Sequence, residues 1–235
     1  MLEVLQSPEQ FRDARQAMRR QGRSALEAAP LRWMRRWGLA PGLAVGDYIK
    51  SWDVARTLEM IEQRLPRDAA ILDLGAFCSE VPVALAMMGY THVHGIDLNP
   101  DISRMPMANK VRYAVGNFMD TPYADASFDA ITAISVIEHG YEPERLLAEV
   151  ARLLRPGGMF LASFDYWPQK IDTAGAKFFD LSWLIFSQRD YESMLEIAAR
   201  YGLRPLADTR QQAAARAIHW AGFDYTFAWT ALQKS

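Results

Sequence analysis

The chain is predicted to adopt an α/β fold that is doubly wound around a mostly parallel sheet. Between Ile71 and Phe164, short apolar segments alternate with segments of helical character. Such alternation is typical of parallel strands joined by helices on both faces of the sheet. Residues 128–135 are also almost continuously apolar, as expected of a strand that is buried on both faces.

Local patterns place the individual elements. Strands are expected at 71–74, 92–96, 112–115, 128–135 and 159–164, with an antiparallel closing strand at 225–232. Helices are expected at 8–21, 25–37, 52–65, 82–88, 143–154 and 187–201. Ser7 and Pro8 form a typical helix start, and Gly22 and Gly202 are plausible stops. We therefore expect a helical N-terminal extension at 1–50 and a main domain at 51–235.

The composition limits the function. The formal net charge is −2, which gives no reason to expect a nucleic acid partner. Cys78 is the single cysteine, so an internal disulfide is excluded and a reducing compartment fits. No apolar run approaches the roughly 20 residues that cross a bilayer, and no secretory signal is visible at the start. These features predict a cytoplasmic protein.

The charge is uneven along the chain. Residues 1–50 hold nine Lys or Arg and five Asp or Glu. Within them, segment 31–37 combines three arginines with Trp33 and Trp37, which share one helix face. Contact with an anionic membrane surface is one interpretation. A lid over the active site or a contact in a homo-oligomer is the commoner use of such a segment.

The most informative stretch begins at Ala70. A short apolar strand leads into Gly75, a helix follows, and a second strand ends at Asp97 about twenty residues later. A nucleoside cofactor needs this order, because the glycine turn allows a close backbone approach and the carboxylate can bind the ribose hydroxyls. The unit therefore predicts a cofactor-binding enzyme.

Five motifs in order resemble one family. They are Ile71–Gly75, Asp97 after the second strand, 116–123 before Ser127-Phe128-Asp129, Ile137-Glu-His139 and Leu154-Arg-Pro-Gly-Gly158. Together they look like a class I S-adenosylmethionine-dependent methyltransferase of type 11, over roughly residues 50–200. The resemblance implies a seven-stranded Rossmann-like sheet and S-adenosylmethionine as the cofactor.

The resemblance also implies roles for individual residues. The expected cofactor-binding residues are Asp73, Gly75, Ala76, Phe77, Asp97, Leu98, Asn117, Phe118 and Ser135. His139, with Glu138, follows the fourth strand, where ligands gather in doubly wound sheets. We expect His139 to act as the base for a hydroxyl acceptor, although lining the cofactor pocket is an equal alternative. Related quinone-pathway enzymes bind a metal through Glu-x-x-Glu-His; Ser135 replaces the first acid here, so no metal is expected.

An aromatic and polar loop follows the fifth strand. Rings that stack on apolar sugar faces and polar groups that bridge hydroxyls suit a sugar. The expected substrate-binding residues are Asp165, Tyr166, Trp167, Lys170, His219 and Trp220. A buried aromatic lid without sugar selectivity is an equal alternative. We therefore expect O-methylation of a small polar acceptor, a sugar or glycan hydroxyl first of all.

Two other functions stay open. The first is an NAD-dependent nucleotide-sugar oxidoreductase with the same topology. Phe77 and Ser79 occupy the later glycine positions of the turn, which disfavours a pyrophosphate because it must approach bare backbone. The second is a non-catalytic protein that binds S-adenosylmethionine as a sensor or scaffold.

Overall fold

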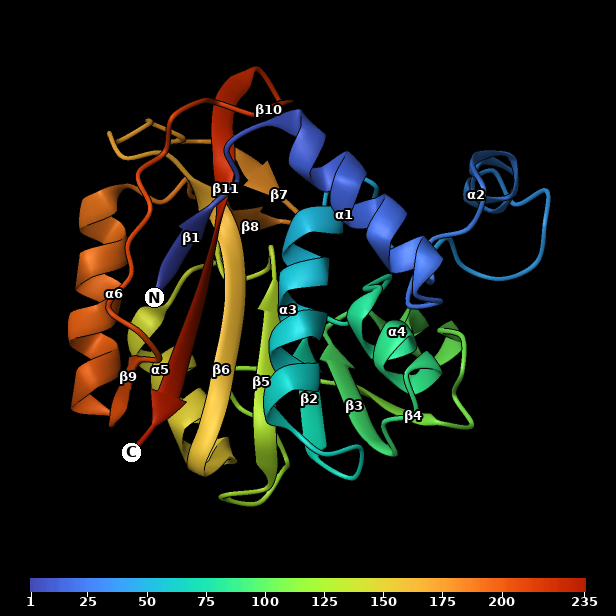
Figure 1. Cartoon of the computed structure of the whole chain (residues 1–235), viewed down its shortest axis with the longest axis horizontal. Helices are drawn as coiled ribbons and strands as arrows, with labels where there is room; N and C mark the ends of the chain where they lie inside the picture. The colour runs from blue at the N-terminus through green and yellow to red at the C-terminus, as the bar shows by residue number, and fades with distance from the viewer.

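A mixed sheet organises the molecule (Figure 1). The computed structural model describes residues 1–235, apart from the side chain of Arg36. The parallel part consists of β2 (Ala70–Leu74), β3 (His92–Asp97), β4 (Val111–Val115), β5 (Phe128–Ile134) and β6 (Leu154–Tyr166). β11 (Phe223–Lys234) runs antiparallel to β6, and β1 (Leu2–Val4) runs antiparallel to β11. The expected doubly wound, mostly parallel sheet is confirmed.

The strand order is β1-β11-β6-β5-β2-β3-β4, so the expected number of seven holds for this main path. Two further strands, β9 (Leu203–Pro205) and β10 (Ile218–Trp220), also pair with β11. A separate hairpin is formed by β7 (Lys177–Phe178) and β8 (Leu181–Ser182). The sequence did not reveal these strands, because two or three residues are too few to show an alternating pattern.

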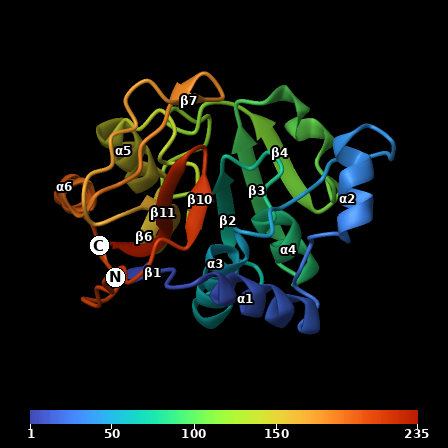
Figure 2. The same ribbon diagram turned by 90° about the horizontal axis from the view of Figure 1, so that it is seen from above.

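Helices cover both faces of the sheet (Figure 2). They are α1 (Pro8–Arg20), α2 (Ala29–Arg36), α3 (Ser51–Arg64), α4 (Val81–Met87), α5 (Pro143–Leu153) and α6 (Gln188–Arg200), with a 3₁₀ turn η1 (Pro100–Arg104). Leu72 of β2 packs in one core with α5 and α6, whereas Ile71 packs in another with α3 and α4. Successive strand residues point to opposite faces, which is why these two neighbours enter different cores.

The predicted turn at 155–158 lies inside β6 rather than before it. Phe128 of β5 pairs with Leu154, and the next pair joins Ala130 to Met159. The register therefore shifts, as in a β-bulge, and absorbs the extra residues of the turn. β6 is consequently longer than the predicted 159–164.

Two elements of the first 50 residues pack onto the main domain. β1 is an edge strand of the sheet, and α1 packs against α3. α2 stands away from the sheet in both views (Figures 1 and 2). The division of the chain at residue 50 stays a proposal, since only part of this region could act as a lid. No helix in the described part of the chain is long and apolar enough to cross a membrane.

A buried ion pair ties α1 to the start of α4. Arg15 Nη1 and Nη2 donate to the two carboxylate oxygens of Glu80 at 2.6 and 2.7 Å, and both side chains are almost fully buried. The backbone N–H groups of Ala25 and Leu26 donate to the same carboxylate at 2.8 and 3.1 Å. One carboxylate therefore anchors the N-terminal segment next to the turn that follows β2.

We predict that Arg15→Met lowers the free energy of unfolding by about 3–5 kcal/mol, because it leaves the Glu80 carboxylate buried without its cation. Urea denaturation measures the loss. The matched control is Arg12→Met on the same helix: Arg12 pairs with Glu9 in solvent, and an exposed pair contributes only about 0–1 kcal/mol. Equal losses in the two variants would contradict the anchoring role of Glu80.

Candidate functional site

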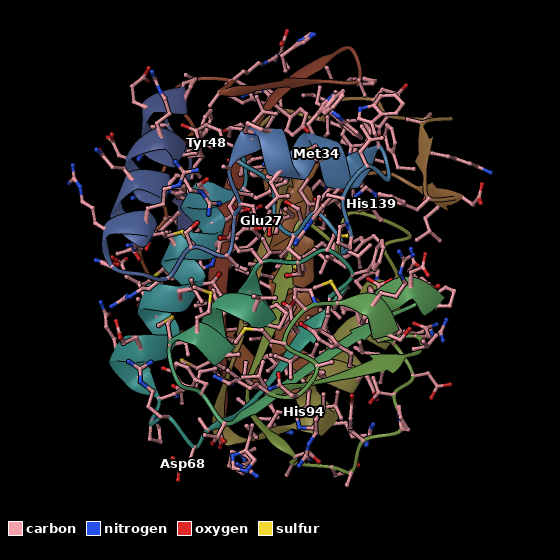
Figure 3. The ribbon with its side chains drawn as sticks, turned by 90° about the vertical axis from the view of Figure 1, so that its right-hand side faces the viewer. Glu27, Met34, Tyr48, Asp68, His94 and His139 are labelled. Atoms are coloured by element: carbon pink, nitrogen blue, oxygen red, sulfur yellow. The ribbon has the colours of Figure 1, made fainter. Side chains whose placement is uncertain are left out.

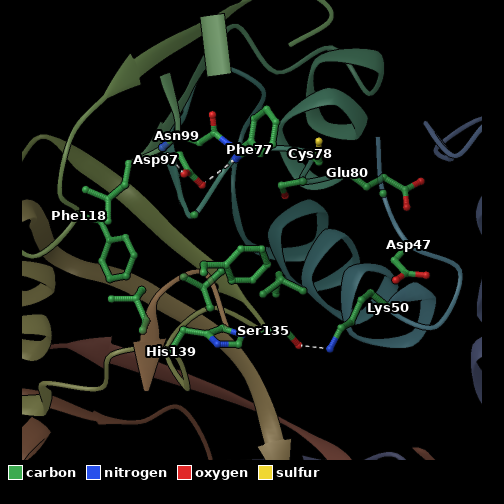
Figure 4. A pocket seen from close by; sticks show the side chains of 18 of the residues that line it. Asp47, Lys50, Phe77, Cys78, Glu80, Asp97, Asn99, Phe118, Ser135 and His139 are labelled. Atoms are coloured by element: carbon green, nitrogen blue, oxygen red, sulfur yellow. Dashed lines mark hydrogen bonds between the residues drawn. The ribbon is translucent and has the colours of Figure 1, made fainter. Parts of the chain in front are cut away.

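A pocket of about 970 Å³ opens at the carboxyl ends of β2, β3 and β5 (Figure 4). The lining residues can be described as two groups, one on each side of the pocket. The turn side of the pocket contains Gly75, Phe77, Asp97 and Phe118. The Lys50 side contains Lys50, Ser135, His139 and Phe179. Strand ends in an open α/β sheet are the usual place for a ligand.

Gly75 is required by the turn. Its φ is +68°, and a Cβ at this position would lie 2.5 Å from Val136 Cγ2. Any side chain would therefore be strained and would collide with the loop that follows β5. The next residue, Ala76, is fully buried and contributes no wall to the pocket. Phe77 does line the pocket, so the wall beside the turn is formed by a side chain and not by bare backbone.

Asp97 is fixed in the pocket wall by two backbone groups. The N–H of Phe77 donates to Asp97 Oδ2 at 3.0 Å, and the N–H of Asn99 donates to Oδ1 at 2.8 Å. Each carboxylate oxygen can accept a further hydrogen bond. The carboxylate is thus oriented before any ligand arrives. Leu98 beside it lines the pocket and is 56% exposed, so an apolar ligand surface could cover it.

Asp73 lies at the end of β2 and is almost completely buried. Thr132 Oγ1 donates to its Oδ1 at 2.5 Å, but its Oδ2 has no hydrogen-bond partner among the described residues. Burial raises the pKa of this carboxyl group to about 7, and nearby Asp97 adds to the shift. A buried acceptor without a donor is costly, and a cationic group would satisfy it. Asp73 itself does not line the pocket.

Phe118 and Asn117 differ in their placement. Phe118 lines the pocket on the turn side, as expected of a residue that flanks a base. Asn117 is exposed and does not line it; its Oδ1 accepts from the N–H of Met119 at 2.9 Å. Asparagine commonly closes a turn in this way. The sequence shows the residue type but not which turn uses its side chain.

His139 lines the pocket, but its pKa differs from the near-neutral value expected of a catalytic base. Burial lowers the pKa of its imidazole to about 4, with a smaller effect from Lys50. The ring is therefore neutral at pH 7 and a weak proton acceptor. Glu138 is buried behind the pocket wall, and one of its oxygens has no partner among the described residues. Burial, and then Asp165, raise the pKa of Glu138 well above its ordinary value.

Lys50 is the residue that the sequence analysis missed. It precedes α3 and its ammonium enters the pocket wall, where Nζ donates to Ser135 Oγ at 2.5 Å. Nζ also lies 3.5 Å from the centroid of the Phe227 ring and 3.8 Å from Asp165 Oδ1. Ser135 has a φ of +51°, which turns it out of β5. No sequence motif marks Lys50, because its partners come from β5, β6 and β11.

All six expected substrate residues lie outside the pocket wall. Tyr166 is buried in the core, Trp167 stacks with Arg216, and Lys170 pairs with Asp190 in solvent. His219 and Trp220 are on β10, where Trp220 packs on Phe178. Asp165 lies behind Lys50 and accepts from Trp183 Nε1 at 2.8 Å. The aromatic residues of this set therefore pack against other side chains outside the pocket wall, whereas Phe179, between β7 and β8, does line it.

Comparison with known proteins shows which family part of this chain resembles. Residues 72–162 match the model of a family described as a methyltransferase domain. An O-methyltransferase of Aspergillus nomiae is 30% identical over 119 residues, which cover 43% of this chain and 53% of the relative. The ubiquinone biosynthesis O-methyltransferase of Xanthomonas axonopodis pv. citri is 32% identical over 120 residues, or 47% and 50% of the two chains. The chain thus spans about half the length of these relatives.

Solved structures share the fold at low identity. An S-adenosylmethionine-dependent methyltransferase from Methanosarcina mazei aligns over 74% of this chain and 96% of its own, with a TM-score of 0.54 and 18% identity. The cyclase SpnF aligns over 98% of both chains, with a TM-score of 0.60 and 15% identity. The second case shows that this fold carries more than one chemistry.

The pKa of Asp73 leads to a prediction about stability. The folded state keeps a proton on this carboxyl group up to about pH 7, whereas the unfolded chain releases it near pH 4. The free energy of unfolding should therefore fall as the pH rises from 4 to 8. In Asp73→Asn this fall between pH 5 and pH 8 should be smaller by about 2–4 kcal/mol.

Urea denaturation at the two pH values measures the difference. Asp68→Asn is the control, because Asp68 is exposed, and its pH dependence should match that of the wild type. If Asp73→Asn keeps the full wild-type slope, the buried carboxyl group is not the titrating one.

Proposed function

We propose that this chain, which contains a class I S-adenosylmethionine-dependent methyltransferase domain, transfers a methyl group to an oxygen atom of a small-molecule acceptor. S-adenosylmethionine is the cofactor of this domain class. The oxygen acceptor is supported by relatives that are themselves named O-methyltransferases. The observation that carries the proposal is the fixed Asp97 carboxylate beside the Gly75 turn in one large pocket.

The residues of the turn side would hold the cofactor. Asp97 would accept from the ribose hydroxyls through the lone pairs that Phe77 and Asn99 leave free. Leu98 and Phe118 would enclose the adenine, and the unpartnered oxygen of Asp73 would face the amino group, directly or through water. S-adenosylmethionine carries no phosphate, so Phe77 does not obstruct it as it would obstruct a dinucleotide.

Alignment supplies most of the acceleration in such a transfer, up to about 7–11 kcal/mol for well-oriented partners. When bound, S-adenosylmethionine supplies a methyl carbon whose bond to sulfur breaks as the bond to the acceptor oxygen forms. The chain contributes the walls that hold the acceptor oxygen in line. Val54, Val136 and Phe179 contribute apolar side chains to these walls.

The identity of the acceptor is a separate question. A sugar or glycan hydroxyl was expected from the aromatic residues after β6. The residues expected to bind a sugar do not line the pocket. No contact among the described residues therefore supports a sugar as the acceptor. A cytosolic location and a homo-oligomer also stay proposals, based on the single cysteine and on the exposed α2 segment.

We predict that Asp97→Ala weakens the binding of S-adenosylhomocysteine about 10- to 100-fold, because hydrogen bonds to a charged group contribute about 1.5–3 kcal/mol each. Isothermal titration calorimetry measures the affinity. Asp101→Ala is the matched control, because Asp101 is exposed and pairs only with Arg104, three residues later, among the ion pairs of the described residues. The affinity of this variant for S-adenosylhomocysteine should equal that of the wild type.

The same titrations test the proposed function. Wild-type protein should give heat with S-adenosylmethionine and with S-adenosylhomocysteine, and none with NAD. Heat with NAD alone would favour the oxidoreductase. Binding without formation of S-adenosylhomocysteine from any oxygen acceptor would favour the non-catalytic alternative.

A further inference from the structure

We propose that Lys50 binds the acceptor through an ionised oxygen, so that the acceptor is an acidic hydroxyl on an apolar body, such as a phenol, and not a neutral sugar hydroxyl. The inference rests on the proposed methyl transfer and names the acceptor class for the same pocket. It is carried by the position of one ammonium group in a part of the wall that also contains Val54, Val136 and Phe179.

The Lys50 ammonium has hydrogen-bonding capacity to spare. An ammonium has three donors, and the hydrogen bond to Ser135 Oγ uses one of them. Asp165 Oδ1 is 3.8 Å away, beyond hydrogen-bond distance, and its second oxygen accepts from Trp183 Nε1. Asp53 accepts from Ser163 Oγ and from the N–H of Val54. Neither acid therefore saturates Lys50. The face of the Phe227 ring, 3.5 Å from Nζ, takes a second donor, which leaves the third for a ligand in the pocket that Lys50 lines.

The charged and titratable groups around Lys50 come from several elements. They are Asp47 in the preceding loop, Asp53 on α3, Glu138 and His139 after β5, Asp165 on β6 and Tyr225 on β11. Burial raises the pKa of Asp53 to about 6, that of Glu138 well above its usual range, and that of Asp165. His139 is neutral. The raised pKa values of Glu138 and Asp165 favour their protonated forms, which reduces the negative charge around Lys50, a residue that lines the pocket.

The rest of the wall suits an apolar body. Phe179 and Leu181 line the same pocket and are 85% and 37% exposed. In the view of Figure 3, α2 with Met34 lies in front, and His139 is labelled near it in projection. An aromatic or aliphatic ligand body would cover these side chains and remove them from water. A sugar would present hydroxyls to them instead.

An ionised acceptor also removes the need for a strong base. The acceptor loses its proton to water before it binds, and its oxygen then carries the electron pair for the new bond to the methyl carbon. The leaving sulfur keeps the pair of the broken bond and becomes a neutral thioether, so that one negative and one positive charge disappear together. Lys50 orients the oxygen until that point. A neutral His139 with a pKa of about 4 is consistent with this route.

The test uses 4-nitrophenol, because its phenolate absorbs visible light and the neutral phenol does not. The probe is titrated into the full-length protein saturated with S-adenosylhomocysteine, over a series of pH values. We expect the wild type to bind the phenolate at least tenfold more tightly than the phenol, which lowers the pKa of the bound probe by about 1 unit or more. Lys50→Met should abolish this preference, and Lys50→Arg should retain most of it.

Lys110→Met is the matched control, since Lys110 is an exposed lysine outside the pocket wall, and it should behave as the wild type. As a second readout, formation of S-adenosylhomocysteine from S-adenosylmethionine is compared for substituted phenols and methyl glycosides. Phenols should react faster, and Lys50→Met should lower kcat/KM for them at least tenfold.

Three results would overturn the inference: no binding of the probe by the wild type at millimolar concentration, an unshifted pKa of the bound probe, or the same shift in Lys50→Met. Binding of S-adenosylhomocysteine is measured first in each variant. If the wild type does not bind S-adenosylhomocysteine, the proposed function itself is refuted. If it binds S-adenosylhomocysteine but shows no preference for the phenolate, only the role of Lys50 is refuted.

Discussion

The Glu80 carboxylate holds together the two parts of the chain that build the pocket. It receives both guanidinium nitrogens of Arg15 from α1 and two backbone N–H groups from residues 25 and 26. Glu80 itself stands at the start of α4, directly after the turn that follows β2. Because loss of the Arg15 cation would leave the Glu80 carboxylate buried and uncompensated, the N-terminal segment is held where Gly46, Asp47 and Lys50 enter the pocket wall.

The two sides of the pocket are built in different ways. The turn side comes from consecutive strand ends within 71–118, and its key contacts join residues close in sequence, such as Asp97 with Asn99. The Lys50 side combines the residue before α3, the loop after β5 and the β7–β8 hairpin. Its geometry therefore depends on packing between distant segments. This difference suits an enzyme class in which the cofactor is constant and the acceptor varies.

Burial governs the electrostatics near the pocket. Asp53, Asp73 and Glu138 all have raised pKa values, and His139 has a lowered one, because each charged form would be removed from water. Lys50 and Asp97 belong to the lining itself, one on each side of the pocket.

The sequence by itself determined the α/β alternation, the Gly75 turn and the acid at the end of β3, because these depend on local periodicity and on short spacings along the chain. It also placed Phe118 and His139 correctly at strand ends. Tertiary structure decided the rest. It brought β1 to the edge of the sheet, moved most of the aromatic residues after β6 out of the pocket wall, and placed Lys50 beside Ser135. Contacts across 85 residues of chain leave no local pattern, and burial, which sets the pKa of His139, exists only once the sheet and its helices have packed.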